Sequence, residues 1–296
     1  MIEINNISLT LDNKKILNNI NLHINNGKIY GLIGPNGVGK TSLIKSLVGI
    51  YKVDDGEILY DGIDIYDDIL TKKKVAYVSD DNKFLSSFRI KDVVKYYKLA
   101  YENFNENKFY KLNKVFNLPL DRKISQLSKG TKTRVSILVA LCQEADYIIL
   151  DEPTSGLDPI IKNKFLKMLV DEVRERGVTI VISSHHLNEL ERICDEVVII
   201  KDGMIQYKNS LEEMKKRIRK IQVAFDAPVY EDDLNINGIY KISKVGRVFT
   251  IITDNYSEEF KEEINKFNPL FIEEIDLALE DIFIYRLGGD DNEYFI

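Results

Sequence analysis

The sequence contains little cysteine and no excess of basic residues. Its two cysteines, Cys142 and Cys194, lie in apolar or helical contexts without metal-ligand spacing. Reduced, packed thiols of a cytosolic protein are therefore expected. There are 41 Lys and Arg residues against 47 Asp and Glu residues, which gives a formal net charge of −6. This balance argues against a nucleic acid held by a basic surface.

Long apolar runs are absent as well. No stretch approaches the roughly 20 consecutive apolar residues that a membrane-spanning helix needs. Residues 1–11, MIEINNISLTL, show no basic segment followed by an apolar run, so a signal peptide is not expected. Any role at a membrane is therefore expected to depend on a partner protein.

Short apolar segments alternate with helical patterns over the first two thirds of the chain, which indicates a parallel sheet covered on both faces. At the start of the chain, residues 1–30 alternate in polarity as strands do. Residues 84–143 contain no convincing strand and are predicted to form an all-helical insertion. The apolar segments are 29–33, 75–78, 147–150, 179–183 and 197–200.

The pattern changes near Met214, where a basic, polar segment suggests the end of a helix. Beyond it, three strands, a charged helix, a strand and a last helix are predicted. Together these elements indicate a small α+β domain of about 80 residues, a size that is marginal for independent folding. The expected domains are 1–215 and 216–296. The predicted elements of the second are 221–225, 239–243, 248–253, 257–267, 270–275 and 277–286.

Residues 34–41 read GPNGVGKT and fit the pattern of a phosphate-binding loop. The glycines let backbone N–H groups point at phosphate oxygens, and the following helix adds its positive end. Lys40 would reach the β and γ phosphates, and Thr41 would offer its hydroxyl to Mg²⁺. A plain glycine-rich turn is less favoured because a strand and a helix flank the loop. The residues predicted to bind ATP here are Gly34, Pro35, Asn36, Gly37, Val38, Gly39, Lys40, Thr41 and Ser42.

The apolar segment 147–150 ends in two carboxylates. Asp151 could hold Mg²⁺ through water, and Glu152 is placed to polarise an attacking water as a general base. Acidic residues also end strands as helix caps. The phosphate loop in the same predicted sheet favours catalysis over capping.

Residues 126–131, QLSKGT, precede an amphipathic helix. Ser128 is a natural N-cap, and Gly130 permits close approach of an anion to the helix end. The stretch is either a simple helix start or a second anion site that faces a nucleotide held elsewhere.

Five motifs in one order resemble the ATP-binding subunits of ABC transporters, over residues 1 to 215. They are the Walker A loop GPNGVGKT, the signature LSKGT, the Walker B strand YIILDE, the D-loop SGLD and the switch histidine in SSHH. The resemblance implies an α/β P-loop NTPase fold of the ABC type. This fold has a mostly parallel sheet, an antiparallel β edge and an all-helical insertion, here followed by the small C-terminal α+β domain.

In that family two subunits pack head to tail and close two ATP molecules between them. By resemblance, His185 would contact the γ-phosphate in its own chain and take part in catalysis with Glu152, and Asp158 would help link the two sites. His186 and His23 match no motif and are expected to be surface or edge residues. The residues implied to face the partner chain's ATP are Ser128, Lys129, Gly130 and Thr131.

Several positions depart from the family pattern. Lys129 and Thr131 stand where glycine and glutamine are common. Asp80 stands at the Q-loop glutamine, where a carboxylate can accept metal-bound water but cannot donate a hydrogen bond. Leu11 aligns with the aromatic residue that stacks on adenine, which predicts weaker base discrimination. The predicted metal ligands are Thr41, Asp151 and Asp80.

The main functional hypothesis is an ATPase that dimerises on ATP and powers export by a separate membrane permease. ATP and Mg²⁺ are the expected cofactors, and the dimer could be formed with itself or with another ABC ATPase. The ending LALEDIFI, residues 277–284, resembles that of ATPases serving small bacterial exporters with six-helix membrane subunits. The expected location is the cytoplasm, at the inner face of the membrane through the permease.

The alternative is a soluble ABC ATPase acting in macromolecular assembly. A single ATPase unit, the lack of a long heptad insertion and the acidic balance disfavour a nucleic-acid partner. A third hypothesis, a non-catalytic binding module, would need a damaged site. Lys40, Asp151, Glu152 and His185 are all present, which disfavours it.

Overall fold

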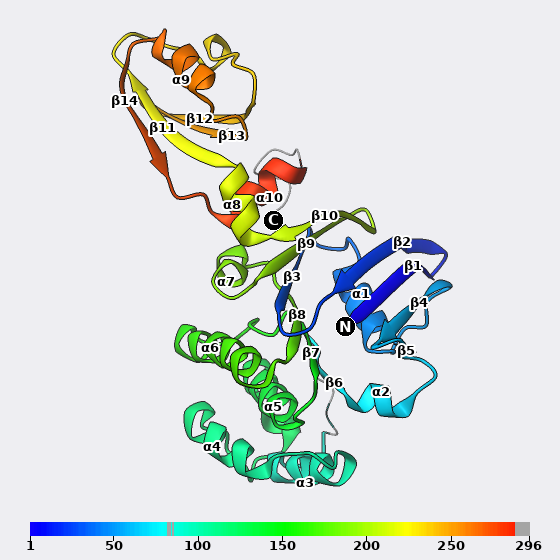
Figure 1. Ribbon diagram of the computed structural model, residues 1–296. Coiled ribbons are helices and arrows are strands. Elements are labelled where there is room, and N and C mark those ends of the chain that lie inside the picture. Colours follow the sequence, from blue (N-terminus) through cyan, green and yellow to red (C-terminus); the bar gives the residue numbers. More distant parts are fainter. Residues whose placement is uncertain (82–83, 85, 288–296) are drawn as a thin grey trace. The chain divides into compact units, whose positions relative to one another are not determined.

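The computed structural model describes residues 1–81, 84 and 86–287 (Figure 1). Their contacts divide the chain into two compact units, Met1–Lys208 and Asn209–Ile296. The predicted boundary at 215/216 falls inside α8 (Leu211–Arg217), a helix that belongs wholly to the second unit. The change of charge at Lys215 marks the last turn of this helix, and the division lies before its start.

A six-stranded sheet forms the centre of the first unit, in the order β10-β9-β3-β8-β7-β6. The pairs from β9 through β3, β8 and β7 to β6 are all parallel. Every residue of β3, β7 and β8 is buried, as expected of a sheet covered on both faces. The strands are β3 (Ile29–Ile33), β6 (Val75–Val78), β7 (Tyr147–Asp151), β8 (Thr179–Ser183), β9 (Glu196–Lys201) and β10 (Met204–Ser210).

A second, antiparallel sheet of the first unit has the order β2-β1-β4-β5. Its buried isoleucines, such as Ile4 and Ile58, share one core cluster with Leu43 and Ile44 of α1 and with Tyr147 of β7. The predicted mixed α/β fold with an antiparallel edge is confirmed by these two sheets. The strands are β1 (Ile2–Leu11), β2 (Lys14–Ile24), β4 (Asp55–Tyr60) and β5 (Ile63–Asp64).

Sequence patterns do not indicate β4, β5 or β10. β4 begins with exposed Asp55, Gly56 and Glu57, and β10 carries half-buried polar residues, so neither reads as an apolar strand. Both are held by pairing with a neighbouring strand, which local periodicity does not report.

The helices of the first unit include an insertion between β6 and β7. Within it, α5 contacts α3, α4 and β6, and Figure 1 shows α3 and α4 beyond the β6–β7 edge of the sheet. No helix in the described part of the chain is long and apolar enough to cross a bilayer. The helices are α1 (Lys40–Leu47), α2 (Ile69–Lys73), α3 (Ile90–Ala100), α4 (Glu106–Phe116), η1 (Ile124–Gln126), α5 (Lys129–Cys142), α6 (Pro159–Arg176) and α7 (Leu187–Glu191).

The second unit contains an antiparallel sheet in the order β12-β13-β11-β14. Alternate residues such as Val223, Phe249 and Ile251 pack against Phe260 and Ile264 of α9. The predicted strands and helices of this region are all present. After α8 they are β11 (Arg219–Phe225), η2 (Glu231–Asp233), β12 (Ile239–Val245), β13 (Val248–Thr253), α9 (Glu258–Asn265), β14 (Pro269–Ile275) and α10 (Leu279–Leu287).

Phe249→Ala is expected to lower the free energy of unfolding of the second unit by about 3–5 kcal/mol, because a fully buried ring is removed. Phe249 is 1% exposed, and its ring centroid lies 5.4 Å from that of Phe225. Hydrogen exchange of the β11 and β13 amides measures the loss. Val245→Ala, at a side chain 81% exposed, is the control and should cost less than about 0.5 kcal/mol. Unchanged exchange in Phe249→Ala would contradict this core.

Candidate active site

The glycine-rich loop lies between β3 and α1, at the carboxyl end of a central strand. Gly37 and Gly39 have φ angles of 79° and 107°, in the left-handed region that glycine adopts without strain. A Cβ on Gly34 would lie 2.4 Å from the carbonyl oxygen of Ile200, so no side chain fits there. The loop therefore curls tightly into the start of α1, where free backbone N–H groups can bind an anion.

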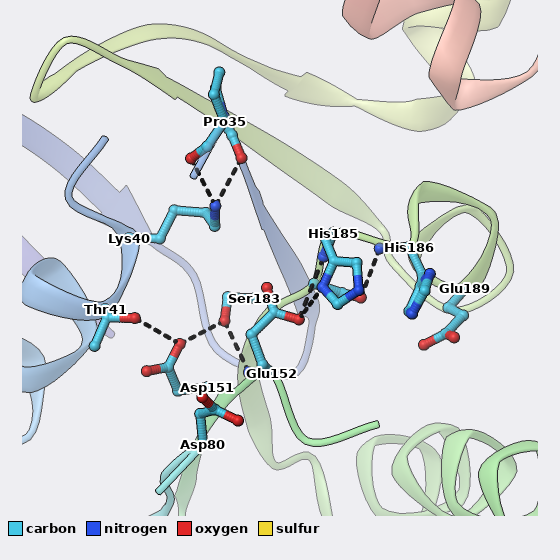
Figure 2. A network of polar contacts seen from close by, with 12 residues as sticks. Pro35, Lys40, Thr41, Asp80, Asp151, Glu152, Ser183, His185, His186 and Glu189 are labelled. Carbon is cyan, nitrogen blue, oxygen red and sulfur yellow. Dashed lines mark hydrogen bonds and ion pairs between the residues drawn. The ribbon is translucent and has the colours of Figure 1, made fainter. Parts of the chain in front are cut away.

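Lys40 is held within the curve of this loop. Its side chain is buried, and its ammonium donates to the carbonyl oxygens of Gly34 and Pro35 at 2.7 and 2.9 Å (Figure 2). Burial lowers the pKa of Lys40, while the negative charges of Glu152 and Asp151 oppose the shift. A buried ammonium is costly without an anionic partner. A phosphate bound by the backbone N–H groups at the start of the helix would supply that negative charge.

Asp151 ends β7 and is 1% exposed. Its Oδ1 accepts hydrogen bonds from Ser183 Oγ at 2.8 Å and from Thr41 Oγ1 at 3.3 Å. Burial raises the pKa of Asp151, and these two hydrogen bonds oppose the rise. A buried carboxylate next to a hydroxyl is a suitable partial ligand set for Mg²⁺, which prefers oxygen ligands.

Asp80 follows β6 and lines a pocket of about 480 Å³ together with Thr41 and Asp151. All three predicted metal ligands thus border one space. The carboxylate of Asp80, however, accepts a hydrogen bond from Lys129 Nζ at 2.8 Å. No group of three His, Cys, Asp or Glu side chains among the described residues could hold a metal by itself. Mg²⁺ commonly uses one or two carboxylates plus phosphate oxygens, which suits this sparse set.

Glu152 turns away from the strand direction directly after Asp151. Its φ is 46°, in a region that non-glycine residues rarely occupy and that often marks functional sites. Its backbone N–H donates to Ser183 Oγ at 3.0 Å, and its Oε2 lies 2.8 Å from Nδ1 of His185. An ionised carboxylate only accepts hydrogen bonds, so in this contact His185 Nδ1–H is the donor and Glu152 Oε2 is the acceptor. Figure 2 shows this contact close to Asp151.

His186 has a role that the sequence does not reveal. Its ring contacts that of His185 in a tilted arrangement, with centroids 3.9 Å apart and 45° between the ring planes, and it is the N-cap of α7. Burial lowers the pKa of His186, which favours the neutral ring. His186 and His23 are both exposed, as expected, and His23 lies on the edge strand β2.

The signature residues lie at the start of α5. Ser128 is the N-cap and accepts from the backbone N–H of Thr131 at 3.3 Å. A Cβ on Gly130 would lie 2.4 Å from the carbonyl oxygen of Gly156 in the D-loop. Gly130 is therefore required first for packing between two backbone segments of one chain. Contact with a partner chain's nucleotide remains a prediction.

The D-loop residue Asp158 caps α6 by accepting from the N–H of Ile161 at 3.0 Å. The same carboxylate pairs with Arg134 of α5 at 2.6 Å. The structure thus links the D-loop to the signature helix through Arg134. The role of Arg134 was not predicted, because no pattern in the sequence of α5 indicates that Arg134 pairs with Asp158 of the D-loop.

Two further features of the site were not predicted. Ser183 joins Asp151 to Glu152, and its place at the end of an apolar strand was a usable signal, since parallel strands end at one edge. Leu11, the predicted adenine contact, is partly buried against the core cluster. Its contact with adenine stays a prediction. Leu17 and Ile16 lie nearest to Gly39, at 3.0 and 3.5 Å from the position of an added Cβ.

Comparisons with known proteins identify the family of this chain. A family model described as ABC transporter matches residues 17–155. The ABC transporter ATP-binding protein YtrB of Bacillus subtilis (strain 168) is 31% identical over 98% of this chain and 99% of its own length. The lantibiotic transport ATP-binding protein SrtF of Streptococcus pyogenes is 33% identical over 69% of this chain and 89% of its own.

Solved structures lead to the same family. The dimeric structure of a bacterial ABC transporter cassette has a TM-score of 0.65 and 25% identity to this chain, and the match covers 71% of this chain and 99% of that one. The sequence match with YtrB covers nearly the whole length of both proteins. The protein is an ABC-type ATPase and belongs to the ATP-binding subunits of ABC transporters.

Proposed function

We propose that the protein dimerises head to tail on ATP, hydrolyses ATP with Mg²⁺ and powers export by a separate membrane-spanning permease. The observation that carries the hydrolysis step is the contact of Glu152 with His185, next to buried Asp151 and the phosphate loop. The proposed location is the cytoplasm, at the inner membrane face through the permease.

The phosphate loop and Lys40 bind and orient the β and γ phosphates. Thr41 and Asp151 would hold Mg²⁺, with Asp80 as a further oxygen ligand from the same pocket. The bound ion supplies positive charge that offsets the charge developing on the phosphate oxygens. Ser183 keeps Asp151 in place through its 2.8 Å hydrogen bond.

Glu152 is proposed as the general base that accepts a proton from the attacking water. The backbone bond from Glu152 N–H to Ser183 and the side-chain bond from His185 hold its carboxylate in one position. His185 Nδ1–H donates to Glu152, so a contact of Nε2 with the γ-phosphate requires Nε2 to carry a proton too, because a phosphate oxygen only accepts hydrogen bonds. His186 supports this orientation by packing its ring, tilted by 45°, against that of His185.

The head-to-tail dimer is supported by the exposure of the signature residues. Ser128 and Lys129 are exposed at the start of α5, where a partner chain can reach them. The similar cassette of known structure is dimeric. The four residues proposed to face the partner's ATP, in the order of the chain, are Ser128, Lys129, Gly130 and Thr131.

Export through a permease is supported by the relative SrtF, whose name assigns it to lantibiotic transport. The ending LALEDIFI, which also suggested an exporter, has a structural role as well. Asp281 pairs with Lys220 at 2.8 Å and so fastens α10 to β11 within the second unit. Export therefore needs its own test, apart from hydrolysis.

Glu152→Gln is expected to lower ATP turnover by about 10²–10⁴-fold, because the amide cannot accept the proton of the attacking water. ATP binding should persist, and the closed dimer should accumulate. Phosphate release and light scattering with ATP measure the two effects. Glu175→Gln, at an exposed carboxylate of α6, is the control. Undiminished hydrolysis in Glu152→Gln would remove Glu152 from the role of base.

Ser183→Ala is expected to shift the acid limb of the pH–activity profile to higher pH. The substitution removes a hydrogen bond to the ionised form of Asp151, so the pKa of Asp151 rises further. Activity that needs ionised Asp151 is then lost at a higher pH than in the unchanged protein. Ser184→Ala is the matched control, because Ser184 Oγ accepts from His186 N–H and does not contact Asp151. An unshifted acid limb in Ser183→Ala would contradict this dependence.

Purification of the tagged protein from its native host in mild detergent tests the permease. Mass spectrometry is expected to find a stoichiometric multi-helix membrane protein. Recovery of soluble proteins alone, unchanged by cross-linking before lysis, would overturn the exporter and favour an ATPase of macromolecular assembly.

A further inference from the structure

An ion pair joins the helical insertion to the segment that follows β6. Lys129 Nζ, in the first turn of α5, lies 2.8 Å from Asp80 Oδ1. The side chains are 59% and 47% exposed, so both also face solvent. These two residues are departures from the family pattern, at the signature and at the Q-loop position, and in this chain they contact each other.

Asp80 is also close enough to the proposed metal site to influence it. It lines the same pocket as Thr41 and Asp151, and Figure 2 shows it next to Asp151 with no bond drawn between them. The negative charge of Asp80 is one of the causes that raise the pKa values of Asp151 and Tyr77. A cation paired with Asp80 therefore changes the field at the metal site.

Lys129 has two possible anionic partners. Within its own chain it pairs with Asp80, and in the proposed dimer it would face the phosphates of a partner chain's nucleotide. The ammonium carries a single positive charge. Pairing with one anion therefore weakens its electrostatic attraction to the other. Asp80 in turn has two cationic partners, Lys129 and a divalent ion.

We propose that Lys129 is a positioning residue that acts through Asp80, holding its carboxylate and competing with the divalent cation for it. The inference rests on the proposed function, because it needs the metal site beside Thr41 and Asp151. A glycine at position 129 and a glutamine at position 80 would carry no such pair. The two departures are therefore joined by an ion pair in this chain.

The size of the effect follows from exposure. Half-exposed ion pairs change equilibrium constants by about 1.5- to 5-fold, because solvent screens them. The pair is thus expected to tune metal affinity without abolishing it. High ionic strength should reduce the difference further, since the Debye length shortens to about 3 Å at 1 M salt.

The test is Mn²⁺ binding in the presence of ADP, measured by electron paramagnetic resonance. ADP lacks the γ-phosphate that the signature is proposed to meet in a partner chain, so the readout reports on one chain's own site. Lys129→Gln is expected to tighten Mn²⁺ binding by about 1.5- to 5-fold, because Asp80 is released. Lys129→Arg keeps the charge and should retain the original affinity. Lys132→Gln, on the same helix, is the control and should also leave it unchanged.

A double-mutant cycle with Asp80→Asn decides the mechanism. In the Asp80→Asn background, Lys129→Gln should have no effect on Mn²⁺ affinity. An equal effect in that background, or none in the unchanged protein, would overturn the inference. Absence of Mn²⁺–ADP binding by the unchanged protein would instead overturn the proposed function, and the inference with it.

Discussion

The parallel register of the central sheet is the constraint on which the site depends. β7 and β8 pair in parallel so that Asp151 lies opposite Ser183, and β3 pairs in parallel with β8 and β9. All these strands therefore deliver their carboxyl ends to one edge. Thr41 and Asp151, 110 residues apart in sequence, come within hydrogen-bond reach at that edge.

Buried charge of both signs follows from this convergence. Lys40 and Asp151 are both buried, and burial shifts their pKa values in opposite directions, each toward the neutral form. Such groups are costly unless opposite charge is brought to them. A magnesium nucleotide carries both signs, with phosphate for the lysine and metal for the carboxylate. The same burial that opposes folding thus favours binding of this kind of ligand.

A chain of contacts leads from buried Asp151 to His186. Ser183 hydrogen-bonds to Asp151 and to the backbone of Glu152, and Glu152 hydrogen-bonds to His185. The ring of His185 in turn contacts the tilted ring of His186. Glu152 is kept in the left-handed region by its surroundings, which directs its carboxylate toward the histidine. After β6, the half-exposed pair of Asp80 and Lys129 supplies a weaker, adjustable charge.

The sequence by itself determined the family, the phosphate loop, the acidic strand end and most elements of the second unit. These features are encoded locally, in the spacing of glycines and in apolar periodicity. Only the tertiary structure decided that Ser183 bridges Asp151 and Glu152, that Gly130 packs on Gly156, and that Lys129 pairs with Asp80. Partners distant in the chain meet through strand register and helix packing, and no local pattern records that meeting. For the same reason the strands β4, β5 and β10 could not be predicted from local sequence, because pairing with neighbouring strands stabilises them.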